Sequence, residues 1–396
     1  MNILYIWDGE YPWDVRVEKI CNSLLGENHN VFLICRNQYA KKRKEKYSGI
    51  NIRRIASAPA QFTVLNSFMT FPFFLSPIWL SEIFSVVKSE KIDLIVMRDL
   101  PMAISALVTK YIYNVPVIFD MAECYPEMLR CTWKFEGLKL RNIFLRNPLI
   151  ADIIERIVIR NVDKTLVMVE ESKYRLERKK VPPGRIHIVS NTPAHDRFLP
   201  AEKKIRDSNE VTKLIYIGLL NPSRGLDTVI QGIGTYIKKY DKKISLIIIG
   251  SGKAEKDLRN LSNELNLSDF IEFKGWIDNK EIPSYLAQAH IGIVSHHICS
   301  HWENTIPNKI FDYMAASRAI VVSNVTPMVR VVHEVGCGGI YEDFNHENFA
   351  DILKSINRPS ELDAMGERGR KAIEDRYNWA QEEKELIRVV NEFNDE

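Results

Sequence analysis

The strongest constraint on the fold of this chain is an alternation between short apolar runs and stretches with apolar residues at helical spacing. In the first half the apolar runs span 3–7, 30–35, 50–55, 94–97, 117–119, 165–169 and 186–190; in the second they span 214–217, 245–249, 270–273, 291–294, 319–322 and 339–341. Strands that alternate with helices form parallel sheets, whose strands are buried on both faces and therefore continuously apolar. The sequence predicts an α/β protein with two doubly wound sheets.

Residues 200–211 interrupt this pattern because they are polar and charged and carry no core periodicity. We interpret them as a linker, and at roughly 100–200 residues per domain the length of 396 residues fits two domains. We expect an N-terminal domain over 1–200, a C-terminal domain over 201–378, and a charged helix over 379–396 that packs back on the N-terminal domain. Ligands of doubly wound sheets bind beyond the carboxyl ends of the strands, so a cleft between the two domains is the expected site.

Charge, cysteine content and hydropathy exclude several classes of protein. The 54 Lys and Arg against 51 Asp and Glu give a net charge of +3, which does not mark a nucleic-acid binder. The six cysteines include no CxxC pair, so we expect reduced thiols in a cytoplasmic protein and no zinc knuckle. The N-terminus lacks the features of a signal peptide. The longest apolar stretch, 62–87, is broken by Pro72 and Pro77 and is interpreted as a loop and a helix, not a membrane span.

Two strand ends in the C-terminal half carry residues suited to phosphate binding. The run 214–217 ends at Gly218, and Arg224 then stands at the start of the next helical stretch. A helix N-terminus with a neighbouring Arg binds phosphate, although an ordinary surface Arg at a helix start is the alternative. The run 245–249 ends at Gly250 and Gly252, where a ligand can approach the backbone or where the glycines simply form a turn.

A third segment, 304–316, combines an amide, a cation and a carboxylate. We expect a loop that opens a helix at about Pro307, with Lys309 and the amides near Asn308 holding a diphosphate. Asp312, one turn further along, would accept hydrogen bonds from the paired hydroxyls of a ribose or a sugar. An amphipathic helix with a solvated face is the alternative.

These motifs, in this order, look like the donor domain of a GT-B glycosyltransferase and, more narrowly, resemble the retaining GT4 family, glycosyltransferase group 1. The resemblance rests on Gly218 with Arg224-Gly225, on Gly250-Ser-Gly252, on Phe273-Lys-Gly-Trp276 and on Pro307 to Ala315. In the first half, Tyr11 to Val17 and Phe119 to Pro126 are similar to bacterial polysaccharide-assembly members. The resemblance covers essentially the whole chain and implies two Rossmann-like domains that face each other across a cleft.

For the donor, the resemblance implies a nucleotide sugar in the C-terminal domain. Arg224 would contact the diphosphate, and Lys309 would compensate for Leu219, which stands where the family usually has an Arg. Asp312 would bind the ribose, while Asn304 replaces the first of the family's paired glutamates. The predicted donor-binding residues are Gly9, Gly218, Arg224, Gly250, Gly252, Trp276, Ile277, Asn304, Pro307, Asn308, Lys309 and Asp312.

For the acceptor, the resemblance points to the N-terminal domain. The position at which family members often carry a His is Ala122, so Glu123 and Asp99 are the nearest polar candidates. Glu123 is expected to orient or deprotonate the acceptor hydroxyl. Asp14 and Arg16 are expected at the cleft, with a capping Asp and a surface Arg as the alternative.

The implied mechanism is front-face return, in which the protein positions the substrates and stabilises the developing phosphate charge. Arg224, Lys309 and Glu123 are the predicted catalytic residues, and His296 is predicted to touch the sugar. His296, His297 and His301 lie close in sequence, but their spacing matches no usual zinc pattern, so neither a metal nor another cofactor is expected.

The resulting prediction is a hexosyl- or N-acetylhexosaminyltransferase that uses a UDP-sugar and a polysaccharide, O-antigen or lipid-linked acceptor. A nucleotide-sugar 2-epimerase of the same fold and a catalytically degenerate binding subunit are the alternatives. The aromatic residues of 62–84, with the basic runs 41–44 and 175–180 and the mixed segment 133–146, predict a peripheral contact with the inner face of the plasma membrane. Core packing with ordinary solvated charge is the competing interpretation.

Overall fold

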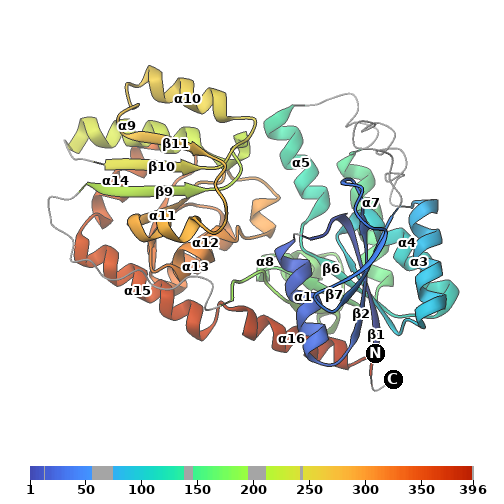
Figure 1. Cartoon of the computed structure of the whole chain (residues 1–396). Coiled ribbons are helices and arrows are strands. Elements are labelled where there is room, and N and C mark those ends of the chain that lie inside the picture. Colours follow the sequence, from blue (N-terminus) through green and yellow to red (C-terminus); the bar gives the residue numbers. More distant parts are fainter. Residues whose placement is uncertain (13, 56–74, 138–145, 195–210, 241–243, 395–396) are drawn as a thin grey trace. The chain divides into compact units, whose positions relative to one another are not determined.

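The computed structural model describes residues 1–12, 14–55, 75–137, 146–194, 211–240 and 244–394, which form two compact units (Figure 1). The N-terminal unit comprises Met1–Arg130, Gly137–Asn191 and Ala380–Glu396. The C-terminal unit comprises Cys131–Glu136 and Thr192–Trp379. The predicted linker lies outside the described residues up to position 210.

The described residues of the N-terminal unit form an eight-stranded sheet in the order β3-β4-β2-β1-β5-β6-β7-β8. All neighbouring strands are parallel except β3 and β4. The strands are β1 (Asn2–Glu10), β2 (Asn30–Arg36), β3 (Lys44–Tyr47), β4 (Ile50–Arg54), β5 (Leu94–Arg98), β6 (Val117–Met121), β7 (Lys164–Val167) and β8 (Ile186–Ile188). The helices are α1 (Val15–Gly26), α3 (Pro77–Glu90), η1 (Leu100–Met102), α4 (Ala103–Tyr113), α5 (Tyr125–Glu136), α7 (Pro148–Asn161), α8 (Glu170–Arg178), η2 (Pro183–Arg185) and α16 (Trp379–Asn391).

All seven strands predicted in the first half are present, and β3 is the strand that the sequence did not indicate. Its sequence, Lys-Glu-Lys-Tyr, has no apolar run, and it pairs only with β4 at the edge of the sheet. A charged edge strand buries neither face fully, so hydropathy does not reveal it.

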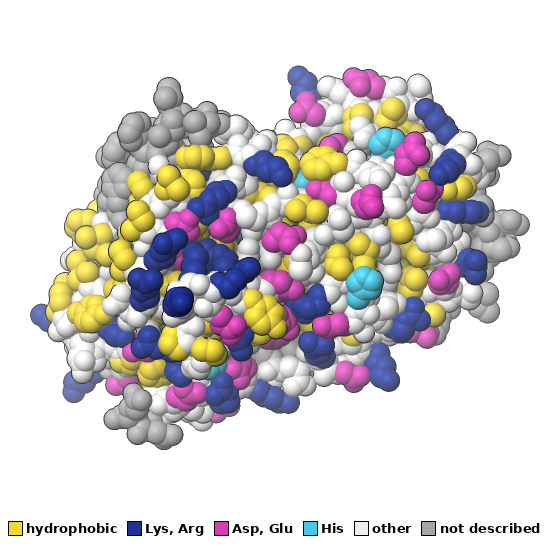
Figure 2. Space-filling model, turned by 180° about the vertical axis from the view of Figure 1, so that it is seen from behind, with side chains coloured by type: hydrophobic (Ala, Val, Ile, Leu, Met, Phe, Trp, Pro, Cys, Tyr) yellow, Lys and Arg dark blue, Asp and Glu magenta, His cyan; other side chains and the backbone are white. Residues whose placement is uncertain are grey.

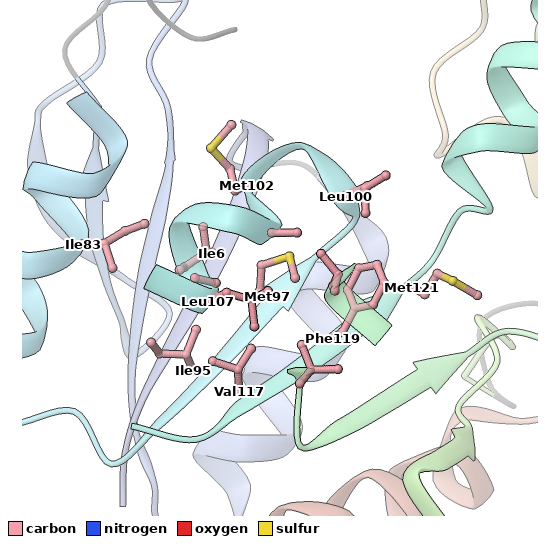
Figure 3. Close-up of a cluster of buried hydrophobic side chains, with 14 of the residues drawn as sticks. Ile6, Ile83, Ile95, Met97, Leu100, Met102, Leu107, Val117, Phe119 and Met121 are labelled. Carbon is pink, nitrogen blue, oxygen red and sulfur yellow. The ribbon is translucent and has the colours of Figure 1, made fainter. Parts of the chain in front are cut away.

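The core of the N-terminal unit lies between the central strands and the helices that cover them. Figure 3 shows Met97 and Phe119, from β5 and β6, beside Leu107 of α4. The described part of the long apolar stretch belongs to this core as well, because Trp79 and Ile83 of α3 are fully buried. Core packing is therefore the correct interpretation for these two residues, whereas residues 62–74 lie outside the described part of the chain.

The described residues of the C-terminal unit form a six-stranded sheet in the order β11-β10-β9-β12-β13-β14, with every neighbouring pair parallel. The strands are β9 (Thr212–Ile217), β10 (Ile244–Ile249), β11 (Ile271–Gly275), β12 (Ile291–Val294), β13 (Ala319–Ser323) and β14 (Gly338–Tyr341). The helices are η3 (Pro222–Arg224), α9 (Leu226–Tyr240), α10 (Glu255–Glu264), α11 (Ile282–Gln288), η4 (Trp302–Asn304), α12 (Lys309–Ala315), α13 (Thr326–Val335), α14 (His346–Ile356) and α15 (Pro359–Asp375). Every strand predicted in the second half is confirmed.

This strand order fixes where a ligand can bind. The chain starts in the middle of the sheet with β9, winds outward to β10 and β11, and returns to place β12 beside β9. The loops that follow β9 and β12 leave the sheet in opposite directions, which opens a crevice at the carboxyl ends of these two strands. Gly218 follows β9 and His296 closely follows β12, so both predicted site residues lie at this switch point.

In the described part of the chain, no helix combines the length and the apolar character that crossing a lipid bilayer requires.

Candidate functional site

Glycines shape the loops at the switch point of the C-terminal unit. Gly218 has a φ of +143° and Gly250 a φ of +135°, and a Cβ on Gly250 would overlap the carbonyl oxygen of Gly218. A Cβ on Gly252 would lie 2.4 Å from the carbonyl oxygen of Leu220, whose amide donates to Ser251 O at 3.0 Å. The close contact between these two loops thus requires glycine at positions 250 and 252. This agrees with the alternative given above, in which the glycines serve the turn and not a ligand.

Arg224 ends η3 directly beside the end of β12. The next residue, Gly225, has a φ of +64°, and a Cβ there would overlap the carbonyl oxygen of Ser295. The Ser295 hydroxyl donates to Arg224 O at 2.7 Å, and the amide of His297 donates to Ser223 O at 3.0 Å. These contacts attach the short helix to the carboxyl end of the sheet, so the backbone of Arg224 is fixed at the switch point.

The guanidinium of Arg224 is held by neutral groups. It contacts His296 Nε2 and lies 4.5 Å from the ring of Trp302. The rings of Trp302 and His296 are themselves 4.3 Å apart. Burial, together with the charges of Arg224 and Lys309, lowers the pKa of His296 well below its usual value. His296 is therefore neutral and accepts a hydrogen bond from Arg224 through Nε2, which leaves the proton on Nδ1. Nδ1 is buried and has no partner among the described residues.

Lys309 is the first residue of α12, two positions later than the predicted start at Pro307. Its Nζ lies 4.0 Å from the ring of Tyr216 and is close enough to Gly218 that a Cβ there would be 2.6 Å away. Burial and the charge of Arg224 lower the pKa of Lys309 well below its usual value, and Asp312 partly offsets them. Two cations therefore converge at the switch point and repel each other.

Within the described residues, neither Arg224 nor Lys309 forms an ion pair, and the buried Nε of Arg224 has no hydrogen-bond partner. Two basic groups at this separation, offset only in part by the carboxylate of Asp312, disfavour each other's charge in the free protein. An anion placed between them would remove the repulsion and gain charge-assisted hydrogen bonds. The switch point is therefore a candidate binding site for an anionic group such as a diphosphate.

The remaining residues predicted on this segment lie around these cations. Asp312 is half-buried on α12, one turn after Lys309, and its amide donates to Asn308 O at 3.1 Å. Asn304 ends η4, and its Nδ2 donates to Ser300 O at 2.7 Å. Glu303, beside it, accepts hydrogen bonds from the amide of Thr326, at 3.1 Å, and from its hydroxyl. The neighbouring carboxylate therefore caps α13 and does not replace the glutamate that the family carries at Asn304.

The predicted base-binding residues follow β11. Trp276 exposes 76% of its surface and Ile277 is half-buried. No described residue forms an aromatic contact with the Trp276 ring. The structure thus brings Gly218, Arg224, His296 and Lys309 together, whereas the binding of a base by Trp276 and Ile277 stays a prediction.

The sequence indicated His297 only as one of three neighbouring histidines and gave no sign of its partners. Its Nδ1 lies 2.6 Å from Asp343 and its Nε2 lies 3.1 Å from Asp227, while the ring of Phe344 stacks on it at 3.8 Å. Burial alone would lower the pKa of His297, but the two carboxylates outweigh burial and raise it to about 9. His297 is therefore a charged internal link between α9, β12 and the loop after β14. Partners 46 and 70 positions away in the chain leave no local pattern.

In the N-terminal unit, Arg16 and Asp14 have internal partners. Arg16 is 1% exposed; its Nε lies 3.0 and 3.1 Å from the two carboxylate oxygens of Asp120, and its Nη1 donates to Val189 O at 2.9 Å. Asp14 caps α1 by accepting from the amides of Arg16 and Val17 at 3.0 Å, and it also pairs with Arg98. Asp14 thus caps the helix, as the alternative interpretation stated. Arg16 forms a buried ion pair with Asp120 and is not a surface residue.

Asp99 and Glu123 lie together at the carboxyl ends of β5 and β6. The amide of Glu123 donates to Asp99 Oδ1 at 3.0 Å. Asp99 has φ 58° and ψ 171°, a conformation that is essentially restricted to glycine and that concentrates at functional sites. Burial, partly offset by Arg98 and reinforced by the charges of Glu123 and Asp120, raises the pKa of Asp99 to about 7. A carboxyl group with this pKa can exchange a proton near neutral pH.

Gly9 lies near the end of β1, where a Cβ would overlap the ring of Trp7. The lack of a side chain at Gly9 therefore leaves room for the ring of Trp7. That ring is 5.4 Å from the guanidinium of Arg98. Among the described residues, no group of three or more His, Cys, Asp or Glu side chains is arranged to hold a metal ion.

Two family models match adjacent parts of the chain. The model of a glycosyl transferase 4-like domain matches residues 14–192, and the model of glycosyl transferases group 1 matches residues 200–372. Together they cover both units that carry the residues described above.

Curated relatives match part of the chain. An uncharacterized glycosyltransferase of Haemophilus influenzae is 25% identical over 236 residues, covering 59% of this chain and 62% of its own length. One of Methanocaldococcus jannaschii is 25% identical over 191 residues, covering 48% and 47%. The chain thus spans about half to three fifths of the length of these relatives.

Solved structures match the whole chain in fold. Sucrose-phosphate synthase from Thermosynechococcus elongatus has a TM-score of 0.81 at 14% identity, covering 100% of this chain and 99% of its own. WaaG, a glycosyltransferase of lipopolysaccharide biosynthesis, has a TM-score of 0.69 at 13% identity, covering 98% and 99%. Anabaena HepE in complex with UDP has a TM-score of 0.71 at 10% identity, covering 99% and 100%. The predicted fold, GT-B with two Rossmann-like domains, is confirmed.

Proposed function

We propose that this chain, which belongs to the glycosyltransferases of the group 1 and 4-like type, transfers a sugar from a nucleotide-sugar donor held by its C-terminal unit. The observation that carries the proposal is the pair of cations at the switch point. Arg224 and Lys309 converge beside Gly218, and neither has an ion-pair partner among the described residues. A nucleoside diphosphate supplies the two negative groups that such a site requires.

The two cations also suit the chemistry of the transfer. Cleavage of the bond between sugar and diphosphate leaves negative charge on the phosphate oxygens, and fixed cations stabilise that charge as it develops. We assign this role to Arg224 and Lys309. The proposal retains the front-face mechanism with retention of configuration at the sugar carbon, and it assigns the compensation of charge to these side chains without a metal ion.

For the donor base we propose uridine. The Anabaena protein HepE has been solved in complex with UDP and with UDP-glucose, and its fold matches that of this chain. The exposed ring of Trp276, at the end of β11, offers a surface for the base beside the predicted backbone contact at Ile277. The half-buried carboxylate of Asp312 is the proposed partner of the ribose hydroxyls. The transferred group would be a hexosyl or an N-acetylhexosaminyl unit.

For the acceptor we propose a polysaccharide, an O-antigen or a lipid-linked sugar bound by the N-terminal unit. WaaG is named for lipopolysaccharide biosynthesis, and this chain shares its fold. Asp99 and Glu123 are the proposed acceptor-binding residues. Asp99 joins Glu123 as a candidate proton acceptor because its pKa of about 7 lets it take up a proton under neutral conditions.

A thermal-shift panel of UDP, GDP, ADP and dTDP, each with its common sugars, tests the donor site. A ligand at about 100 times its dissociation constant stabilises the folded state by roughly 2.7 kcal/mol, a shift of a few degrees. We expect UDP or a UDP-sugar to raise the melting temperature, and Arg224→Gln to reduce the shift by about half or more. Arg259→Gln, on the exposed side of α10, is the matched control and should keep it. No shift with any nucleotide would contradict the proposal.

The fate of the nucleotide sugar that gives the thermal shift distinguishes the transferase from the two alternative functions. Sugar transferred to an added glycan or lipid-linked acceptor identifies a transferase. Isomerised free nucleotide sugar in the absence of acceptor identifies the 2-epimerase. Binding without turnover under either condition identifies the degenerate binding subunit.

A further inference from the structure

We infer that the outward face of α7, with the adjoining end of α4, is a surface by which the N-terminal unit contacts an anionic lipid bilayer. The inference goes beyond the proposed function, because binding to a bilayer needs neither the donor nor turnover. It also identifies a surface other than the stretch 62–84 that the sequence indicated.

The helix α7 exposes apolar side chains along one side. Leu149, Ile153 and Ile157 recur every four residues, so they line a single face, and they expose 66%, 59% and 43% of their surface. The opposite face packs on the core through Ala151, Val158 and Ile159. A surface helix of a globular protein normally carries polar residues opposite its buried stripe. This helix is apolar on both sides.

The charges of α7 are divided between its two faces. Both acids lie away from the exposed apolar side: Glu155 is 1% exposed and lies 2.7 Å from Arg175 and 2.6 Å from Lys179, and Asp152 also pairs with Lys179. Arg156 and Arg160 lie on the exposed face, seven and eleven positions after Leu149. Neither forms an ion pair within the described residues. The exposed face of α7 thus combines apolar side chains with charged side chains that are all basic.

The end of α4 extends this surface. The Tyr111 hydroxyl donates to Asn161 Oδ1 at 2.8 Å, which joins α4 to the end of α7. Tyr111 and the next residue, Ile112, expose 66% and 58% of their surface. A tyrosine with an apolar body and a polar tip suits the level of the lipid headgroups. Figure 2 shows one face of the molecule, on which hydrophobic, basic and acidic side chains are interspersed.

A bilayer explains this composition better than a second copy of the chain. A two-fold contact would place the patch against itself, so the unpaired charges of Arg156 and Arg160 would face a surface of the same sign, since the nearby Asp163 is already paired with Lys110. A helix lying in the interface instead buries its apolar residues among the acyl chains and turns its arginines to the headgroups. Anionic headgroups attract each such basic residue by about 1 kcal/mol.

The groups that the sequence proposed for membrane contact are partly used inside the protein. Arg175 and Lys179, from the basic run 175–180, form the ion pairs with Glu155 and Asp152. Trp79 is fully buried in α3. These three residues are therefore unavailable to a bilayer, and the contact is assigned to α7 instead.

Co-sedimentation of the full chain with vesicles made of equal parts phosphatidylcholine and phosphatidylglycerol tests the inference. We expect binding at low salt, and at least a tenfold loss of binding in Ile153→Asp/Ile157→Asp. Arg156→Gln and Arg160→Gln should each weaken binding about fivefold, the equivalent of one basic residue. The matched controls are Tyr39→Ser, an exposed aromatic residue on another loop of the same unit, and Lys238→Gln, an exposed cation of α9. Both should bind as the unchanged chain does.

Three outcomes would overturn the inference. They are no binding of the unchanged chain to the anionic vesicles, equal binding by the Ile153→Asp/Ile157→Asp variant, and a dimer in solution that this variant abolishes. The last outcome would assign the surface to a second copy of the chain. The thermal shift with UDP, measured on the same variants, should stay unchanged because α7 lies in the other unit. Loss of vesicle binding is thereby distinguished from failure of the donor site.

Discussion

Two arginines, the buried Arg16 and the half-buried Arg224, show how a cation can be interpreted from its partners. Arg16 is enclosed by Asp120 and the carbonyl of Val189, so its charge is neutralised inside the protein. Arg224 contacts a neutral imidazole and an indole ring, and the nearby basic group is Lys309, whose pKa is lowered by burial and by the charge of Arg224. The first cation is a completed structural pair, whereas the second requires an external anion. Both residues were predicted to be functional from their positions in similar motifs, and only their partners separate the two roles.

The largest expected effect is on the stability of the N-terminal unit. Arg16→Gln leaves Asp120 as a buried carboxylate without its cation, and breaking a buried pair on one side costs about 3–5 kcal/mol. Chemical denaturation should show this loss, with the thermal shift from UDP retained in protein that is still folded. A loss below about 1 kcal/mol would contradict the structural role that the comparison assigns to Arg16.

The opposite result is expected for Arg224→Gln. Loss of hydrogen bonds from a charged group to the diphosphate should weaken UDP binding by roughly ten- to a hundredfold. The free energy of unfolding should change little, because no carboxylate among the described residues loses a partner. Titration calorimetry, together with denaturation, measures both quantities. A variant that is strongly destabilised but binds UDP normally would reverse the roles of the two arginines.

The ion pair of His297 with Asp227 and Asp343 gives a pH dependence to the stability of the C-terminal unit. The pKa of His297 is raised from 6.5 to about 9, so the stabilisation is complete below pH 6.5 and is lost as the pH rises through about 9. The free energy of unfolding should fall by about 3 kcal/mol across this window. Denaturation in His297→Gln should show a flatter profile, and an equal slope in both proteins would contradict the prediction.

The smallest expected effect is a proton taken up with the nucleotide. Arg224 and burial hold the pKa of Lys309 well below its usual value, and a bound diphosphate would raise it again. Between these two pKa values, binding should therefore take up as much as one proton. Calorimetry in two buffers of different ionisation enthalpy measures this uptake. Lys309→Arg, which stays charged, should show none of it.

The fold could be predicted from the sequence because parallel strands leave a direct record. Strands buried on both faces are continuous apolar runs, so each of the thirteen predicted runs coincides with an observed strand. β3 was missed because an edge strand of Lys-Glu-Lys-Tyr has no such run. The start of α12 was placed two residues early, since Pro307 suits a first helical turn but lies just before the helix.

The site was only partly predictable. Gly218, Arg224 and Lys309 were found because strand ends and helix starts meet at one edge of a parallel sheet. The function of Gly250 and Gly252 was not decided, because loop packing and ligand binding demand the same small residue. The sequence grouped His297 with His296 and His301 but did not reveal its carboxylate partners, and Glu303 was separated from Asn304 only by its contact with Thr326.

By itself, the sequence determined the alternation of strands and helices, the two sheets and the position of the cations at strand ends and helix starts, because all of these follow from short-range patterns of hydrophobicity, glycine and charge. The tertiary structure decided which charges are already neutralised: Arg16, Arg175 and His297 meet carboxylates, and Arg224 meets none among the described residues. Such pairings join residues far apart in the chain, so no local pattern records them. These pairings nevertheless determine whether a cation stabilises the fold or is available to bind a ligand.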